Sequence, residues 1–136
     1  MFEAFEHTAD LGLRIRAATL DELFVEAARA LFSTLVEDLA AVRQSERVAV
    51  TVGGADREYL LFDWLRELLC RFEMDHQLCS RFEVKVRPDG LTATAWGEPI
   101  DRGRHELGHE VKAITYHGLT VEQTDSGWLA EVIVDI

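Results

Sequence analysis

Residues 19–35, TLDELFVEAARALFSTL, decide the fold that we expect. Thr19 and Glu22 have the spacing of a capping box, in which two side chains satisfy free backbone N–H groups at the start of a helix. The apolar residues after this start recur at intervals of three and four, as one face of a helix requires: Leu20, Leu23, Phe24, Ala27, Ala28, Leu31, Phe32 and Leu35. The stretch therefore predicts an amphipathic helix.

A second helix is predicted from about Asp56 to Phe72. Its apolar face contains Leu60, Leu61, Trp64, Leu65, Leu68, Leu69 and Phe72. The opposite side of each helix is polar, so we expect each helix to pack on a single layer.

The rest of the chain alternates with period two, which is typical of strands with one buried face. Three such runs are Leu11-Leu13-Ile15, Val48-Val50-Val52 and Phe82-Val84-Val86. The turn sequences 88–90 and 125–127 predict two hairpins, and the β-branched stretch 111–116 predicts a further strand. Strands gather late in the chain and do not alternate with helices. We therefore predict a single α+β domain over residues 1–136, with two helices packed against mainly antiparallel sheet.

Charge and composition exclude several classes of function. The chain has 14 basic and 25 acidic residues, a net charge of −11. Such a surface repels phosphate backbones, so no direct nucleic-acid binding is expected, and a metal cation or a basic partner protein fits better. The first residues lack the pattern of a signal peptide, and no apolar run approaches the ~20 residues of a membrane span. We therefore expect a cytoplasmic protein without a membrane association.

One string matches a metal-binding motif. His105-Glu106-Leu107-Gly108-His109 has the form H-E-x-x-H, which in zinc hydrolases lies on a helix so that both imidazoles bind zinc. The glycines and the β-branched residues around it disfavour a helix, and residues 97–110 are predicted to form an exposed loop. A small zinc-dependent hydrolase that uses His105, Glu106 and His109 is the alternative function.

Four blocks of sequence carry a family resemblance. They are His7-Thr8-Ala9-Asp10, LFDWLRELL at 61–69, VKAITYH at 111–117 and WLAEVIVDI at 128–136. In this order and spacing they resemble the archease family over essentially the whole chain. The resemblance implies a non-catalytic accessory protein of an RNA ligase. That ligase uses GTP to join RNA ends with a 3′-phosphate or 2′,3′-cyclic phosphate to a 5′-hydroxyl, in tRNA splicing and RNA repair. The accessory protein promotes guanylylation of the ligase and its multiple turnover.

The resemblance also implies a divalent metal site formed by Asp10, Asp135 and the α-carboxylate of Ile136. The expected ion is Ca²⁺, with Mg²⁺ or Mn²⁺ as alternatives. Three anionic oxygen groups repel one another unless a hard cation neutralises them, which makes the ligand set chemically reasonable. The alternative is that both aspartates are solvated strand ends.

Three further residues are candidates for contact with the partner. His7 could orient Asp10 or could lie in the core, Asp63 could be a charge at the flank of its helix, and Lys112 could reach a partner or only solvent. A structural or chaperone-like module that acts through an exposed apolar patch is a third possibility for the function.

Overall fold

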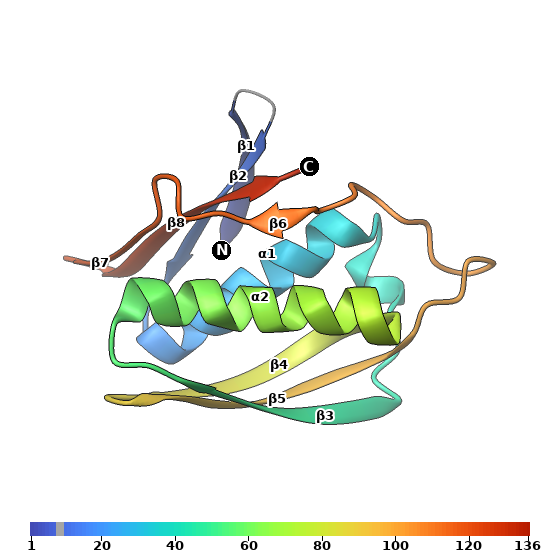
Figure 1. The fold of residues 1–136 in the computed structure, drawn as a ribbon, viewed down its shortest axis with the longest axis horizontal. Coiled ribbons are helices and arrows are strands. Elements are labelled where there is room, and N and C mark those ends of the chain that lie inside the picture. Colours follow the sequence, from blue (N-terminus) through green and yellow to red (C-terminus); the bar gives the residue numbers. More distant parts are fainter. Residues whose placement is uncertain (8–9) are drawn as a thin grey trace.

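The two helices lie between two antiparallel sheets, as the ribbon in Figure 1 shows. The computed structural model describes residues 1–7 and 10–136, with residues 6 and 7 described by their backbone alone. The elements are β1 (Phe2–His7), β2 (Asp10–Ala17), α1 (Leu20–Leu35), the short 3₁₀ helix η1 (Leu39–Ala41), β3 (Glu46–Gly53), α2 (Arg57–Asp75), β4 (Gln77–Arg87), β5 (Gly90–Pro99), β6 (Ala113–Ile114), β7 (Thr120–Thr124) and β8 (Gly127–Asp135). The predicted α+β class is confirmed.

The larger sheet joins the beginning of the chain to its end. Its strands follow the order β1-β2-β8-β6, and β7 also pairs with β8. The smaller sheet has the order β3-β5-β4, and every pair in both sheets is antiparallel. Strand β8 therefore lies beside β2 on one side and beside β6 and β7 on the other.

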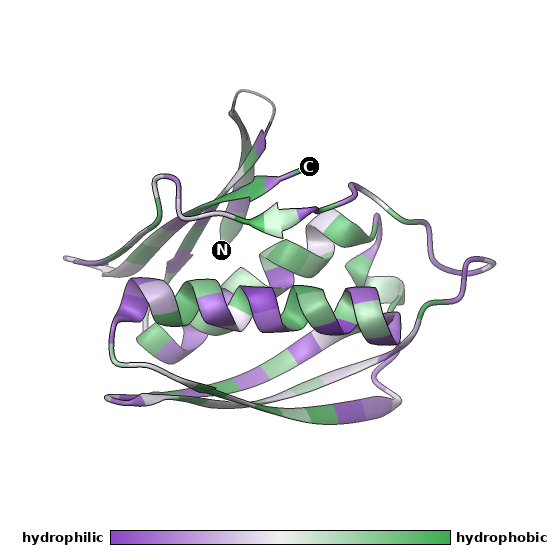
Figure 2. Cartoon of the chain, in the orientation of Figure 1, coloured by the Kyte–Doolittle hydropathy of each residue, from purple (hydrophilic) through white to green (hydrophobic). Residues whose placement is uncertain are grey.

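Both helices begin where the sequence predicts. The Thr19 hydroxyl accepts a hydrogen bond from the Glu22 N–H at 3.2 Å and caps α1. The Asp56 carboxylate accepts from the N–H groups of Glu58 and Tyr59 at 2.9 and 3.0 Å and caps α2. Hydrophilic residues recur along the side of α2 that faces the viewer in Figure 2. Neither helix of the described chain is apolar enough over a sufficient length to cross a membrane.

The expectation that each helix packs on one layer is wrong for both helices. Helix α1 contacts β2 of the larger sheet and β4 of the smaller one, and α2 contacts β6 of the larger sheet and β3 of the smaller one. Ala30 and Phe32, two positions apart and so about 200° apart around the helix, are both buried. The Phe32 ring stacks on Phe82 of β4, with ring centroids 5.7 Å apart. Ala30 lies outside the apolar stripe that the sequence predicts for α1. A small side chain such as alanine is found both in solvent and in the core, so the sequence does not reveal this second buried side of the helix.

Trp64 connects the two helices inside the core. Its indole N–H donates to the carbonyl of Phe24 in α1 at 3.0 Å, and both side chains are fully buried. Its ring meets Phe82 of the smaller sheet edge-on at 6.3 Å. A buried indole needs a partner for its N–H, and this one finds it on the neighbouring helix.

Both predicted hairpins are confirmed, at β4–β5 and β7–β8. Strand β1 was not predicted, and β6 is shorter than the predicted stretch 111–116. Phe5 of β1 lies opposite Gly12 of β2, and its ring fills the space that a side chain at Gly12 would occupy. An aromatic side chain over a strand glycine restores contacts that glycine cannot make.

Candidate metal site on the larger sheet

Asp10 and Asp135 face each other across the β2–β8 pair. Ala113 of β6 lies opposite Asp135 on the other side of β8, and the Lys112 N–H donates to the Asp135 carbonyl at 2.7 Å. The three neighbouring strands thus carry Asp10, Asp135 and Ala113 in one row. Ala113 has the smallest side chain of the row.

The aspartate pair projects from the outer face of the larger sheet. Leu13, Val132 and Val134 point into the core, so the alternate residues Asp10 and Asp135 point away from it. Both aspartates are half-buried. The next outer row contains Gly12 and Ile133, and Ile133 is only 5% exposed although it lies outside the main core. The carboxylates therefore lie beside an apolar surface.

The donor set fits a hard divalent cation. Directly opposed residues of antiparallel strands have Cβ atoms about 4.5–5.5 Å apart, close enough for both carboxylates to reach one ion at about 2.3–2.6 Å. Ile136 follows Asp135 directly and packs against the core. Within the described residues no three His, Cys, Asp or Glu side chains form a metal cluster. Two carboxylates do not fill the coordination shell of Ca²⁺, so further oxygen ligands would have to join this pair.

The partner-facing candidates do not all lie at this site. Lys112 is exposed and joins Asp135 through its backbone. Asp63 lies on α2 and lines a hollow with Thr51 and Gly53 of the smaller sheet, so the fold does not bring it to the aspartate pair. The side chain of His7 lies outside the described residues.

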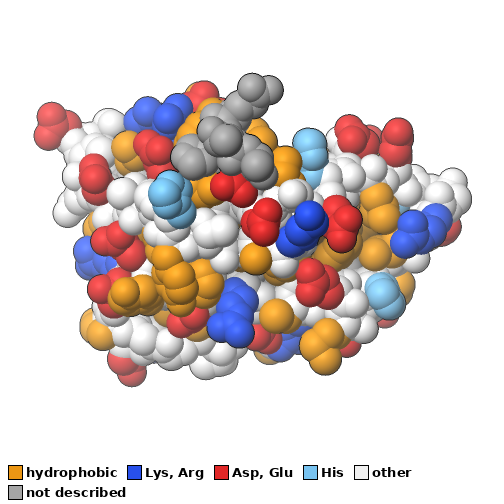
Figure 3. Space-filling view, turned by 45° about the horizontal axis from the view of Figure 1, so that its top comes forward, with side chains coloured by type: hydrophobic (Ala, Val, Ile, Leu, Met, Phe, Trp, Pro, Cys, Tyr) orange, Lys and Arg blue, Asp and Glu red, His pale blue; other side chains and the backbone are white. Residues whose placement is uncertain are grey.

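An aromatic cluster, made of the exposed Tyr59 and Tyr116 and the buried Phe62, was missed by sequence reasoning. Tyr116 follows shortly after β6 and stacks on Phe62 of α2, with centroids 3.8 Å apart, while Tyr59 meets it edge-on at 5.5 Å. Tyr59 and Tyr116 are 59% and 55% exposed. Figure 3 shows an apolar patch over the first half of α2, with acidic side chains around it. The exposed Tyr59 belongs to no apolar period, so only the fold reveals the cluster.

The H-E-x-x-H string does not lie on a helix. Residues 105–109 run in irregular backbone against the end of α1. The N–H groups of Gly108 and His109 donate to the carbonyls of Leu35 and Thr34, each at 2.9 Å. These carbonyls end a helix and lack partners within it, so the string caps α1.

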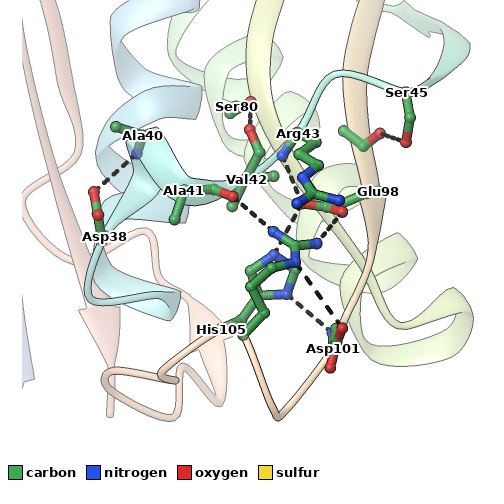
Figure 4. A network of polar contacts seen from close by, with 12 residues as sticks. Asp38, Ala40, Ala41, Val42, Arg43, Ser45, Ser80, Glu98, Asp101 and His105 are labelled. Carbon is green, nitrogen blue, oxygen red and sulfur yellow. Dashed lines mark hydrogen bonds and ion pairs between the residues drawn. The ribbon is translucent and has the colours of Figure 1, made fainter.

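His105 has no ring nitrogen left for zinc, as the close view in Figure 4 shows. Its Nδ1 accepts from the Asp101 N–H at 2.9 Å, and its Nε2 lies 3.0 Å from a carboxylate oxygen of Glu98. Because Nδ1 accepts, the proton is on Nε2, which donates to Glu98. The predicted exposed loop 97–110 is wrong at two places: residues 97–99 belong to β5, and His105 is only 3% exposed. His109 is exposed, as predicted for the loop. This geometry does not support the zinc-hydrolase alternative.

Glu98 is the centre of this polar network. It is 6% exposed and accepts hydrogen bonds from the Arg104 guanidinium, the Arg43 N–H and His105. Burial raises the pKa of Glu98, but these hydrogen bonds and the Arg104 charge outweigh it and lower the pKa to about 2. Arg104 also donates to the Ala41 carbonyl at 2.9 Å. The network joins η1, β5 and the loop after β5.

The fold defines a class of α+β proteins. In this class the first hairpin pairs with the last strand in one sheet, and the helices lie between that sheet and a second one. The model of the archease protein family (MTH1598/TM1083) matches residues 2–136. An archease of Methanopyrus kandleri is 46% identical over an alignment of 139 positions, which covers 99% of both chains. The chain therefore belongs to the archease family.

Two solved structures share the fold. The solution structure of protein 1598 of Methanobacterium thermoautotrophicum is 38% identical, with a TM-score of 0.78 over 99% of this chain and 98% of that one. A crystal structure from Thermotoga maritima, described as an archease and possible chaperone, has a TM-score of 0.69 over 100% of this chain and 98% of that one. At 23% identity, the second supports the fold alone.

Proposed function

We propose that this protein is a non-catalytic activator of a cytoplasmic, GTP-dependent RNA ligase. The ligase joins RNA 3′-phosphate or 2′,3′-cyclic phosphate ends to 5′-hydroxyl ends in tRNA splicing and RNA repair. The activator promotes guanylylation of the ligase and its multiple turnover. Membership of the archease family supports this role, and the role itself does not require this chain to contact RNA.

The observation that carries the proposal is the direct opposition of Asp10 and Asp135. We assign these two carboxylates and the α-carboxylate of Ile136 as ligands of a divalent cation, Ca²⁺ or in its place Mg²⁺ or Mn²⁺. The bound ion would supply positive charge near the phosphates that the ligase handles. The residues of this chain hold the two carboxylates in fixed register, because each belongs to a hydrogen-bonded strand.

Charge favours a basic partner. The net charge of −11 complements the positive surroundings that an RNA-handling enzyme needs, so association should be fast and sensitive to salt. Lys112, exposed next to Asp135, and the undescribed side chain of His7 are the candidates for contacts at the metal site. Asp63, away from the aspartate pair, would touch the partner only through a wider interface.

A chaperone-like role is the second candidate, and the aromatic cluster favours it. Tyr59 and Tyr116 expose a connected apolar surface on a protein with few other exposed large apolar side chains among its described residues. Such surfaces bind partner proteins.

The test is a ligation assay with the cognate ligase, GTP and RNA carrying a 3′-phosphate, with RNA in excess over ligase. The protein should raise the product well beyond one turnover per ligase, and Asp10→Asn or Asp135→Asn should reduce this gain about tenfold or more. Asp125→Asn, in the exposed turn before β8, is the matched control and should keep the full gain. No gain with the unmodified protein would overturn the proposal.

A further inference from the structure

The outer face of the smaller sheet is basic in an acidic protein. The inner positions of its strands, such as Val50, Phe82 and Leu91, are buried against the helices. The alternate positions that face outward are Arg47, Ala49 and Thr51 on β3, Thr92, Thr94 and Trp96 on β5, and Arg81, Glu83, Lys85 and Arg87 on β4. This face carries four cations and one carboxylate, the reverse of the 14 to 25 ratio in the whole chain. No helix or strand of the described chain covers it (Figure 1).

Trp96 lies at the centre of a row across the three strands. Its register partners are Arg47 on β3 and Arg81 on β4. The Arg81 guanidinium carbon is 4.3 Å from the centroid of the Trp96 ring, a cation–π contact that holds Arg81 at the surface. Neighbouring strands are about 4.8 Å apart, so the three side chains form a continuous basic and aromatic row.

Small residues, three of them threonines, continue the face beyond this row. Thr92, Thr94, Ala49 and Thr51 line an open hollow of about 430 Å³, and one cation, Lys85, and one carboxylate, Glu83, also line it. Threonine hydroxyls donate to phosphate and sugar oxygens without blocking access to the sheet. The face thus combines cations, hydroxyl donors and one large aromatic ring on a sheet surface.

We propose that this outer face, centred on Trp96 and flanked by Arg47, Arg81 and Lys85, binds single-stranded RNA. Cations that track a backbone and aromatic side chains on which bases stack are the two elements of sequence-tolerant single-strand binding. An acidic peptide would satisfy the cations but would have no base to stack on Trp96, so RNA fits the observed combination better.

The distribution of charge explains why the sequence led to the opposite expectation. A net charge of −11 is an average over the surface, whereas binding depends on the local field. Glu83 forms an ion pair with Arg81 at 3.0 Å, so part of the Arg81 charge is already neutralised on the face. Glu46 and Asp89 at the rim weaken the attraction further. The binding should therefore be weak and strongly salt-dependent. It does not depend on the proposed ligase role, because it can be measured with this chain alone.

The experiment is fluorescence anisotropy of a short unstructured oligoribonucleotide titrated with the full chain. Three to four phosphate contacts predict a slope of about −2 to −3 in log affinity against log salt, or about a 20- to 50-fold loss between 50 and 200 mM salt. Arg47→Ala/Lys85→Ala should lower the affinity at least about fivefold at low salt, and Trp96→Leu at least about threefold. Circular dichroism confirms that each variant is folded.

The matched control is Arg16→Ala/Arg102→Ala. It changes the net charge by the same amount but leaves the smaller sheet intact, because both arginines are exposed elsewhere. It should retain the affinity within about twofold. Absence of binding at low salt, or an equal loss in the control, would overturn the proposal. Unchanged RNA binding by Trp96→Leu, together with full competition by an acidic peptide, would overturn it in favour of an acidic protein partner.

Discussion

Asp10 of β2 and Asp135 of β8 occupy directly opposed positions in neighbouring antiparallel strands. Like charges in such positions destabilise a sheet unless something neutralises them. The pairing of the first hairpin with the last strand brings them together, and the apolar row of Gly12 and Ile133 lies next to them. A divalent cation bound between the two carboxylates would stabilise this pairing of the first hairpin with the last strand.

Glu98→Gln should destabilise the protein by about 2 to 3 kcal/mol. The substitution removes the charged acceptor of Arg104, the Arg43 N–H and His105 and leaves polar groups poorly paired in a buried site. Glu106→Gln, an exposed acid in the same loop, should stay within about 0.5 kcal/mol of the unmodified protein. Equal unfolding midpoints for the two variants would contradict the structural role of the network.

The same network predicts a pH dependence. The pKa of Glu98 is lowered to about 2 in the folded protein, below the value near 4.3 of an unfolded glutamate. Its contribution to stability is therefore complete above the unfolded pKa and is lost as the pH falls through the folded pKa. The stability difference between the unmodified protein and Glu98→Gln should shrink from pH 5 towards pH 2. Unfolding curves recorded at several pH values test this, and a difference that stays constant over this range would refute it.

Gly108→Ala should destabilise the protein by about 1 to 3 kcal/mol. A Cβ at Gly108 would lie 2.5 Å from the Thr34 carbonyl oxygen, so the loop would have to leave the end of α1 that it caps. At Gly53 a Cβ would meet nothing within 4 Å, which makes Gly53→Ala the matched control. Thermal unfolding should separate the two variants, and similar midpoints would contradict the tight contact.

Metal analysis of the purified protein should find no stoichiometric zinc. Both ring nitrogens of His105 are hydrogen-bonded, so zinc binding would require disruption of the contacts with Asp101 and Glu98. His105→Ala should lower stability and leave the zinc content unchanged. About one zinc per chain, lost in His105→Ala, would revive the hydrolase alternative.

Much of the fold could be predicted because short sequence patterns mark the starts of the helices and the turns of the hairpins. The caps at Thr19 and Asp56 mark both helix starts, and turn residues mark both predicted hairpins. The second buried side of α1 could not be predicted, because Ala30 is as compatible with solvent as with a sheet. Strand β1 has an outward aromatic, Phe5, whose burial depends on a glycine in the next strand.

The candidate site could be predicted only through family resemblance. Nothing local in the sequence shows that Asp10 and Asp135 are paired, since register between distant strands is a property of the whole sheet. The H-E-x-x-H string misleads for the same reason, because the contact of His105 with Glu98 forms only in three dimensions. The basic face around Trp96 likewise depends on the pairing of three strands.

Calorimetric titration with Ca²⁺ tests the central claim most directly. The unmodified protein should bind about one ion per chain, and Asp10→Asn, Asp135→Asn and an added residue after Ile136 should each weaken that binding strongly, while Asp125→Asn should not. Equal Ca²⁺ affinity for the unmodified protein and Asp135→Asn, or no binding at all, would contradict a cation site at this row.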